Sequence, residues 1–467
     1  IIYMKTKLIN IFVLLSSIFN YNIAQVAPAY SPYTLEYGGI ELSINSIYIS
    51  TDDFEIDFRE NANLTVYPNQ FIWRLELILH EFKTGHLAIS NWNIPQGGRL
   101  FIFNDLESYT GPYLKTNQTE LISGRFKSNN LILEYSEPVL PEFQGNFTIA
   151  GIKPDYVADS VMKENPVSVF MNQSRERPKI MLTGYWPPTN EMVRHFSQDS
   201  ELNPEGWQGE NWEGLGYDVV SFFPQFEPAD CNDCGQGYGD LEVDYQDFSQ
   251  DFWPIVEEVQ PVGIMTFSRG FNDMSWELEN RLVNRTNWFD DYTAPLLPTP
   301  NPPDDTVNNY HVRYTSLPVS DIINAIQEAH IGLDPYLDNT NAGMFLSEFA
   351  GYHGVWYKET YDEDIEIPCF SGGHIHVGAQ VDWDTAKEAA EVSIRTLIDY
   401  IDQFIILPGD CNGDGEVNIL DVVALASVIL GNSEFTPSQT TAADMDGNGL
   451  LNILDIIALV NLILGNN

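Results

Sequence analysis

Ser347, His376 and Glu279 are the residues whose types and spacing could carry out nucleophilic catalysis. Ser347 stands in "NAGMFLSE", His376 in "GGHIHVG" and Glu279 in "WELENRLVN". A serine hydroxyl is a poor nucleophile at neutral pH and needs a base within hydrogen-bond reach. A histidine can take the proton, and a carboxylate can hold the imidazole tautomer and stabilise its cation. The trio therefore predicts acyl transfer, with Ser347 as nucleophile, His376 as base and Glu279 as the orienting acid.

Neighbouring residues compete for these roles. Glu277 replaces Glu279 as the orienting acid if the strand register shifts, and His374 is expected to be structural. Cys369 is expected to be a small buried residue. Asp382 and Asp384 suit the first turn of a helix. Ser347 itself has two other interpretations, which are a relic of a lost nucleophile site and a plain turn serine.

The segment that must position these residues alternates strands with helices. Apolar strands are expected in "KIMLTGYWPP", "GYDVVSFFPQF", "GIMTFSRG" and "GGHIHVG", and helices in "DFWPIVEEV", "PVSDIINAIQEAHIG" and "WDTAKEAAEVSIRTLIDYIDQF". This alternation predicts an α/β domain with a mostly parallel sheet over residues 178–405. In such sheets, functional groups gather on loops at the carboxyl ends of the strands.

The preceding region has a β pattern. Short runs such as "FIWRLELILH", "NLILEYSEP" and "NFTIAGI" are separated by Gly, Asn and Pro turns, which predicts an all-β sandwich over 26–152. It resembles the β-sandwich modules found beside secreted bacterial peptidases. It has no cluster of catalytic residue types, so we expect a structural or binding module. Residues 153–177 are expected to be a linker.

The last sixty residues hold a repeat with a period of 34 residues. "GDCNGDGEVNILDVVALASVILG" and "ADMDGNGLLNILDIIALVNLILG" each place oxygen-bearing residues at loop positions 1, 3, 5, 9 and 12, with Gly415 or Gly449 at position 6. Calcium takes six to eight oxygen ligands from such a loop. The predicted ligands are Asp410, Asn412, Asp414, Glu416, Asn418 and Asp421 in the first copy, and Asp444, Asp446, Asn448, Leu450, Asn452 and Asp455 in the second, with Glu416 and Leu450 acting through backbone carbonyls. Two structural Ca²⁺ ions are therefore expected.

The repeat at 408–467 resembles a type I dockerin domain, which implies paired F-hands and a cohesin-type scaffold partner. Positions 10 and 11, often hydroxylated in that family, are Ile419–Leu420 and Ile453–Leu454 here. The middle segment resembles pyroglutamyl peptidase I. The match rests on E-x-x-x-x-N at Glu279 and Asn284, on A-G-x-x-x-S ending at Ser347, and on I-H-V around His376. The resemblance implies an α/β/α fold and a Glu–Cys–His triad in which Ser347 replaces the cysteine.

Composition and the N-terminal segment limit the possible partners and the cellular location of the protein. The chain has 467 residues, and 67 acidic against 22 basic residues give a formal net charge of −45, which disfavours partners such as nucleic acid. Residues 1–25 are typical of a signal peptide, and no later apolar run is long enough to span a membrane. A secreted protein is therefore expected. Cys231 and Cys234, the one CxxC pair, are expected to form a local disulfide.

Three functions follow from these observations. The first is a secreted peptidase or amidohydrolase that acts on a peptide or amide substrate through Ser347. The second is a catalytically inactive, scaffold-attached binding protein. The third is a carbohydrate-active component of a polysaccharide-degrading assembly. This function rests only on the resemblance to dockerins, which often tether enzymes of polysaccharide breakdown.

Overall fold

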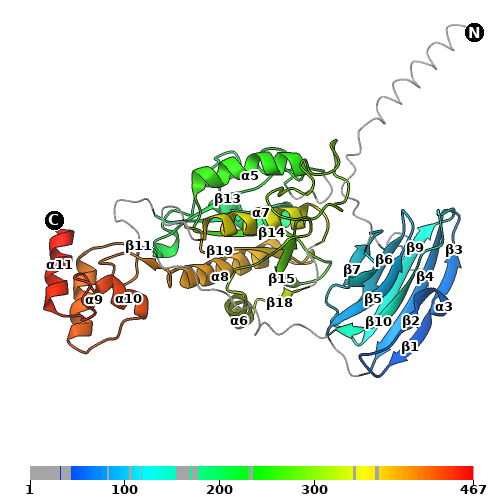
Figure 1. Cartoon of the computed structure of the whole chain (residues 1–467), viewed down its shortest axis with the longest axis horizontal. Coiled ribbons are helices and arrows are strands. Elements are labelled where there is room, and N and C mark those ends of the chain that lie inside the picture. The colour runs from blue at the N-terminus through cyan, green and yellow to red at the C-terminus, as the bar shows by residue number, and fades with distance from the viewer. Residues whose placement is uncertain are drawn as a thin grey trace, which may run out of the picture.

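The computed structural model describes residues 32, 44–80, 84–104, 108–116, 118–153, 169–170, 177–229, 231, 235–339, 343–362 and 368–465. The expected signal peptide and most of the expected linker lie outside these residues. Figure 1 shows an all-β part, a central α/β part and a small helical part in chain order. No helix in the described ranges combines the length and apolar character needed to cross a bilayer.

The N-terminal part is the predicted β-sandwich. One sheet contains β1 (Asn45–Ile49), β3 (Asn63–Val66), β4 (Gln70–Leu79), β6 (Arg99–Phe103), β7 (Tyr109–Tyr113) and β9 (Asn130–Pro138). The other contains β2 (Ile56–Asp57), β5 (His86–Asn93), β8 (Glu120–Ile122) and β10 (Asn146–Lys153), with the short helix α3 (Phe58–Asn61) beside it. Alternate residues such as Leu75, Leu77 and Leu133 point inward and are fully buried, as a two-sheet core requires.

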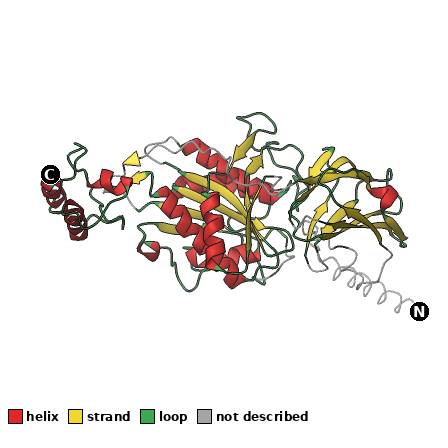
Figure 2. Ribbon diagram, turned by 90° about the horizontal axis from the view of Figure 1, so that it is seen from below, coloured by secondary structure: helices red, strands yellow, loops and turns green. Residues whose placement is uncertain are grey.

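The central part is a six-stranded sheet between two helical layers. Its strand order is β13 (Asp218–Phe222), β12 (Lys179–Thr183), β14 (Gly263–Arg269), β19 (Ser371–Val377), β15 (Ser275–Glu279) and β18 (Asp334–Asp338). All neighbouring pairs are parallel except β15 with β19. Helices α5 (Tyr245–Val259) and α7 (Leu346–Tyr361) cover one face, and α4 (Pro187–Val193), α6 (Val319–Ala329) and α8 (Trp383–Ile401) cover the other (Figures 1 and 2). The α/β/α prediction is therefore confirmed.

Smaller elements complete this part. Two short 3₁₀ turns, η1 (Arg194–Phe196) and η2 (Trp212–Gly214), precede β13. An antiparallel pair, β16 (Arg281–Val283) with β17 (Val312–Tyr314), follows β15, and β11 (Val169–Phe170) pairs with β20 (Ile405–Ile406). Asp382 caps α8 by accepting a hydrogen bond from the Thr385 amide at 3.0 Å, so the predicted helix-start role of Asp382 is confirmed.

The C-terminal part has three helices, α9 (Ile419–Ile429), α10 (Pro437–Ala443) and α11 (Ile453–Ile463). Helices α9 and α11 pack together around Leu425 and Leu459, which are both fully buried. Neither helix has a core of its own, so each repeat depends on the other to bury its apolar side chains. A cleft of 1090 Å³ lies where this part meets the α/β part, and none of its lining residues belongs to the predicted catalytic trio.

Two cysteines are free and one is bonded. Cys369 and Cys411 are buried free thiols, which confirms the structural role expected of Cys369. Cys231 is disulfide-bonded, and Cys234, its predicted partner, lies outside the described residues.

Glycines let α7 lie directly on β19. A Cβ at Gly351 would lie 2.8 Å from the Cβ of His374, and a Cβ at Gly372 would lie 3.0 Å from the carbonyl oxygen of Gly354. On the opposite face, a Cβ at Gly373 would meet Thr315 Oγ1 at 2.2 Å. The "SGG" that opens β19 is therefore required by close packing on both sides of the strand.

Gly351→Val is expected to destabilise the protein by about 1–3 kcal/mol, because the added side chain has no space against His374. Thermal or urea unfolding measures the change. Ser320→Val, at an exposed position of α6, is the matched control and is expected to change stability by less than about 0.5 kcal/mol. Equal effects of the two substitutions would contradict the close packing of α7 on β19.

Candidate active site and calcium loops

One face of the central sheet, the face that α7 covers, carries a buried polar cluster. Because side chains alternate between faces along a strand, Ile375 and Leu278 join the apolar core on the other side while their neighbours face α7. The polar residues on the α7 face are Thr266 and Ser268 of β14, His374 and His376 of β19, Glu277 and Glu279 of β15, and Tyr336 and Asp338 of β18. All eight are buried. The strands of a sheet covered on both faces are normally continuous runs of apolar residues, so this polar cluster is the candidate functional region.

Glu279 and His376 are hydrogen-bonded to each other. The His376 Nδ1 atom lies 2.6 Å from Glu279 Oε1 and 3.9 Å from Glu277 Oε2. In the strand register Glu277 faces His376 and Glu279 faces His374, so Glu279 reaches His376 diagonally. The structure thus brings together two members of the predicted trio and makes Glu279, rather than Glu277, the hydrogen-bonding acid.

His374 is held by hydroxyl groups on both sides of its ring. Its Nδ1 lies 2.7 Å from Thr266 Oγ1, and its Nε2 lies 2.8 Å from Ser268 Oγ. With both nitrogens in hydrogen bonds to buried side chains, this ring fits the structural role predicted for it.

Burial sets the protonation of the cluster. It lowers the pKa of His376 to about 4, with a smaller opposing effect from Asp338. It also raises the pKa of Glu279 well above its usual range, and Asp338 and Glu348 add to that rise. Both shifts have the same cause, which is the loss of water around a charge. The uncharged imidazole that results is the form able to accept a proton.

Ser347 is the second residue of α7 and is partly exposed. The next residue, Glu348, is fully buried and fixes this turn of the helix. One of its oxygens accepts a hydrogen bond from the Val283 amide at 2.9 Å, and the other accepts one from Arg285 Nε at 2.5 Å. The segment that follows Glu279 along the chain therefore clamps the turn that carries Ser347.

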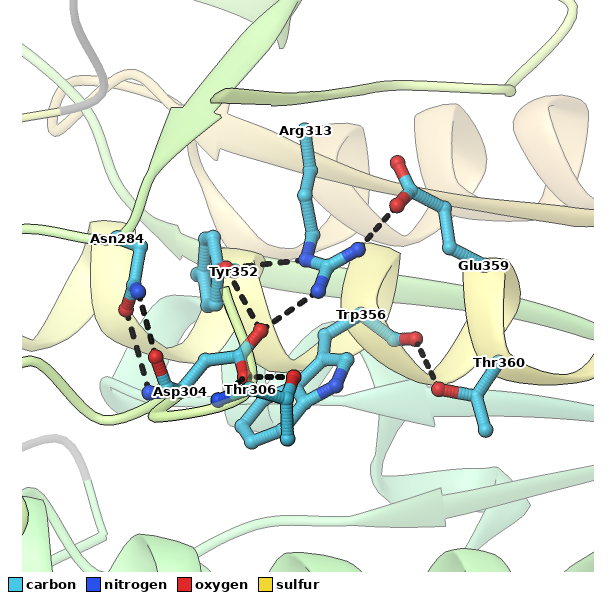
Figure 3. A network of polar contacts seen from close by, with 8 residues as sticks. All are labelled: Asn284, Asp304, Thr306, Arg313, Tyr352, Trp356, Glu359 and Thr360. Carbon is cyan, nitrogen blue, oxygen red and sulfur yellow. Dashed lines mark hydrogen bonds and ion pairs between the residues drawn. The ribbon is translucent and has the colours of Figure 1, made fainter. Parts of the chain in front are cut away.

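Further along α7, a second network holds the helix to the same loop region (Figure 3). Arg313 pairs with Asp304 at 2.6 Å and with Glu359 of α7, and its Nε donates to Tyr352 Oη at 3.0 Å. Asn284, the last residue of the E-x-x-x-x-N motif, donates to the Asp304 carbonyl and accepts from its amide. The role of this motif asparagine is therefore to order the loop that anchors α7.

The β-sandwich contacts the rim of the polar cluster. Arg125 and Lys127 both form ion pairs with Asp334, the first residue of β18, and the Arg125 guanidinium lies 5.1 Å from the centre of the Tyr336 ring. Tyr109 of β7 and Asn272, in the loop before β15, exchange two backbone hydrogen bonds of 3.4 and 3.3 Å. The sandwich is therefore joined to the strands that carry the acids.

The two loops predicted to bind calcium are rich in carboxylates that accept backbone hydrogen bonds. In the first, Asp410 accepts hydrogen bonds from the amides of Gly413, Asp414 and Gly415, and Asp421 accepts them from Cys411 and Asn412. In the second, the carboxylates of Asp444, Asp446 and Asp455 come within 4.8 Å of one another. Asp421 and Asp455, at position 12, are fully buried at the start of α9 and α11. These oxygen-rich sets suit Ca²⁺ in type and spacing.

Residues 408–464 match the dockerin type I domain family. The C-terminal part is a type I dockerin domain. Known dockerins of this type bind calcium and occur in extracellular scaffold assemblies, and the Asp444, Asp446 and Asp455 cluster fits that property. No curated protein sequence matches the chain.

Solved structures of pyroglutamyl peptidases resemble the middle region. One is a mutant pyrrolidone carboxyl peptidase of Pyrococcus furiosus, at 15% identity, a TM-score of 0.34, and coverage of 47% of this chain and 98% of that one. Pyroglutamyl peptidase I of Bacillus amyloliquefaciens is 15% identical, with a TM-score of 0.34 and coverage of 48% of this chain and 97% of that one. The pyrrolidone carboxyl peptidase of Thermococcus litoralis is 14% identical, with a TM-score of 0.35 and coverage of 48% of this chain and 96% of that one.

Sequence reasoning missed several members of the cluster, namely Tyr336, Asp338, Thr266 and Ser268. The available signal was the alternation of polar with apolar residues in strands that helices cover on both faces, as in "SWELE" and "DPYLD". The amino-acid sequence also offered no reason to link the β-sandwich to the site. That link depends on long-range contacts such as Arg125 with Asp334.

Glu348→Ala is expected to destabilise the protein by about 3–5 kcal/mol, because it leaves Arg285 buried without its carboxylate. Urea unfolding measures the loss. Glu328→Ala, at an exposed position of α6, is the control and is expected to have little effect. Similar stability of the two variants would contradict the clamp at the start of α7.

Calcium removal is expected to unfold the dockerin part of the full chain, since its helices begin at the metal loops. Hydrogen exchange with mass spectrometry should show that amides of α9 and α11 lose protection in a chelator, while those of α8 keep it. Asp421→Ala and Asp455→Ala are each expected to lower the bound calcium from two ions to one. Unchanged protection of α9 and α11 would contradict the assignment.

Proposed function

We propose that this protein is a secreted, scaffold-attached hydrolase that cleaves a peptide or amide bond by acyl transfer, with Ser347 as nucleophile, His376 as base and Glu279 as orienting acid. The observation that carries the proposal is the 2.6 Å hydrogen bond between His376 Nδ1 and Glu279 Oε1. When Nδ1–H donates to Glu279, the other ring nitrogen, Nε2, is left as an acceptor for a serine proton.

The packing of α7 supports placing Ser347 near that nitrogen. Gly354 lies against Gly372, and Gly351, one turn earlier, lies against His374. A further turn back along the helix is about 5 Å, and two residues along the strand are about 6–7 Å. If the same register continues, Ser347 lies at the level of His376, which supports pairing these two residues in the proposal.

The start of α7 offers a second contribution. Backbone amides in the first turn of a helix have no intrahelical acceptors, and the helix dipole is positive at this end. A tetrahedral intermediate formed on Ser347 would develop its negative charge beside these amides, which is the requirement for an oxyanion hole. The chemistry thus needs only groups of this chain.

The dockerin supplies attachment in this proposal. It binds two structural Ca²⁺ ions and docks on a cohesin-type scaffold. Residues at equivalent positions of the two repeats form an exposed apolar face: Ile419, Leu420 and Val423 on α9, and Ile453, Leu454 and Ile457 on α11. We infer that the matching partner surface is apolar rather than rich in hydrogen-bonding groups. Attachment of this kind places the hydrolase outside the cell.

Reaction of the full chain with a serine-directed phosphonate tests the catalytic assignment. The reagent is expected to modify Ser347, and Ser347→Ala is expected to abolish both labelling and turnover of peptide substrates. Ser200→Ala, at an exposed position of the same α/β part, is the matched control and should behave as the parent protein does. Labelling at another residue, or activity that survives Ser347→Ala, would assign the chemistry elsewhere. No labelling and no turnover in the parent protein would favour the inactive binding protein.

A further inference from the structure

The acids beside His376 are more numerous than the proposed relay requires. Glu277 and Glu279 are 1% and 0% exposed, and Asp338 pairs with Glu279 in the strand register. Within the described residues, His376 is the only ionic partner within 4 Å of Glu277 or Glu279. A relay needs one carboxylate, so Glu277 has no assigned role.

Two carboxylate oxygens in this group are left without hydrogen bonds. Glu277 Oε2 and Glu279 Oε2 are both buried and have no hydrogen-bond partner among the described residues. Burying an unsatisfied carboxylate oxygen is costly. An orphaned pair beside a histidine nitrogen therefore points to a bound group that satisfies them.

The geometry suits a small metal ion. One ligand atom from each of Glu277, Glu279 and His376 can be chosen so that all lie within 4.8 Å of one another. A tetrahedral ion with bonds of about 2.0–2.2 Å holds its ligand atoms roughly 3.2–3.6 Å apart. Glu277 Oε2 lies 3.9 Å from His376 Nδ1 and would have to approach that nitrogen by only a few tenths of an ångström. Glu279 Oε1 lies 2.6 Å from the same nitrogen and would have to move away from it by about one ångström.

The donor types select the class of ion. One imidazole nitrogen and two carboxylate oxygens are ligands for Zn²⁺ or Mn²⁺. Calcium takes six to eight oxygen ligands, so these donors are distinct from the dockerin loops. His376 keeps 7% of its surface exposed, so the group is not fully closed off from solvent.

We propose that Glu277, Glu279 and His376 form a site for one divalent transition-metal ion of the Zn²⁺ or Mn²⁺ type, whose binding switches off the serine relay. The binding part of this proposal is independent of the proposed function, and the switching part rests on it. A metal on Nδ1 uses the lone pair of that nitrogen, so the Nδ1 proton is displaced. In the neutral ring, the single proton then sits on Nε2. Nε2 can no longer accept the Ser347 proton, and Glu279 is taken from its orienting role.

Metal binding is measured first, on the full chain with its calcium loops saturated by excess Ca²⁺. Titration with Mn²⁺, followed by electron paramagnetic resonance, is expected to show one bound ion per chain, and Zn²⁺ should displace it. Glu277→Gln is expected to weaken binding at least tenfold, whereas Glu257→Gln, the same change at an exposed position of α5, should leave it unaltered. No bound Mn²⁺ or Zn²⁺, or equal affinity in both variants, would overturn the proposal.

X-ray absorption at the zinc edge provides a test that needs no variant. Scattering from one imidazole ring together with oxygen ligands is expected, because this cluster contains a histidine and the acidic cluster of the second dockerin loop does not. An all-oxygen shell would place the zinc in the dockerin loops and would overturn the assignment.

The switch is measured by phosphonate labelling of Ser347. Zn²⁺ is expected to slow labelling at least tenfold in the parent protein and much less in Glu277→Gln. Bound zinc with unchanged labelling would contradict the switch. Absence of labelling without any metal would instead contradict the serine relay, and the binding measurements, repeated in Ser347→Ala, would still decide whether the metal site exists.

Discussion

The antiparallel pairing of β15 with β19, in a sheet whose other pairs are parallel, is the constraint on which the candidate site depends. It sets Glu277 opposite His376 and Glu279 opposite His374, so that two acids of one strand and two histidines of the next share a face. Diagonal neighbours across such a pair lie within reach of long side chains. The Glu279–His376 hydrogen bond is a direct result. A shift of one residue would turn both acids to the apolar face, which is why the register has to be firmly fixed.

Burying these acids is costly, and the surrounding structure has to hold them in place. Glycines in β19 and α7 let the helix close over the cluster, while Glu348, Arg285 and Arg313 tie the helix to the loops that follow β15. Such an arrangement is expected where strain or unfavourable burial serves chemistry rather than stability. The hydrogen bond between His376 and Glu279 and a metal ion held by three ligands are two ways of compensating the burial of these carboxyl groups.

The sequence predicted the parts of this structure that depend on local patterns. Strands β12, β13, β14 and β19, helices α5, α6 and α8, and the Asp382 cap follow from periodicity and capping residues, and they are found where expected. Strands β15 and β18 and helix α7 were not among the expected elements. The pairing of Glu279 with His376 was also accessible, but through motif order rather than geometry. The acid–histidine cluster as a whole was not, because Tyr336 and Asp338 join it through the strand order β19–β15–β18. Strand order is set by contacts between residues far apart in the chain, which no local pattern encodes.

The same reason explains why the β-sandwich appeared to be an independent module. Strand β18 lies at the edge of the central sheet, and an exposed edge strand invites pairing with other chains. Here the sandwich approaches that strand, with Arg125 and Lys127 paired to Asp334 at its start. Tyr336 and Asp338, further along the same strand, belong to the polar cluster. The contact at the start of β18 therefore also helps to fix the strand that carries Asp338 beside Glu279. A domain that carries no catalytic residue type thus contributes to the site by fixing the strand on which part of the site is built.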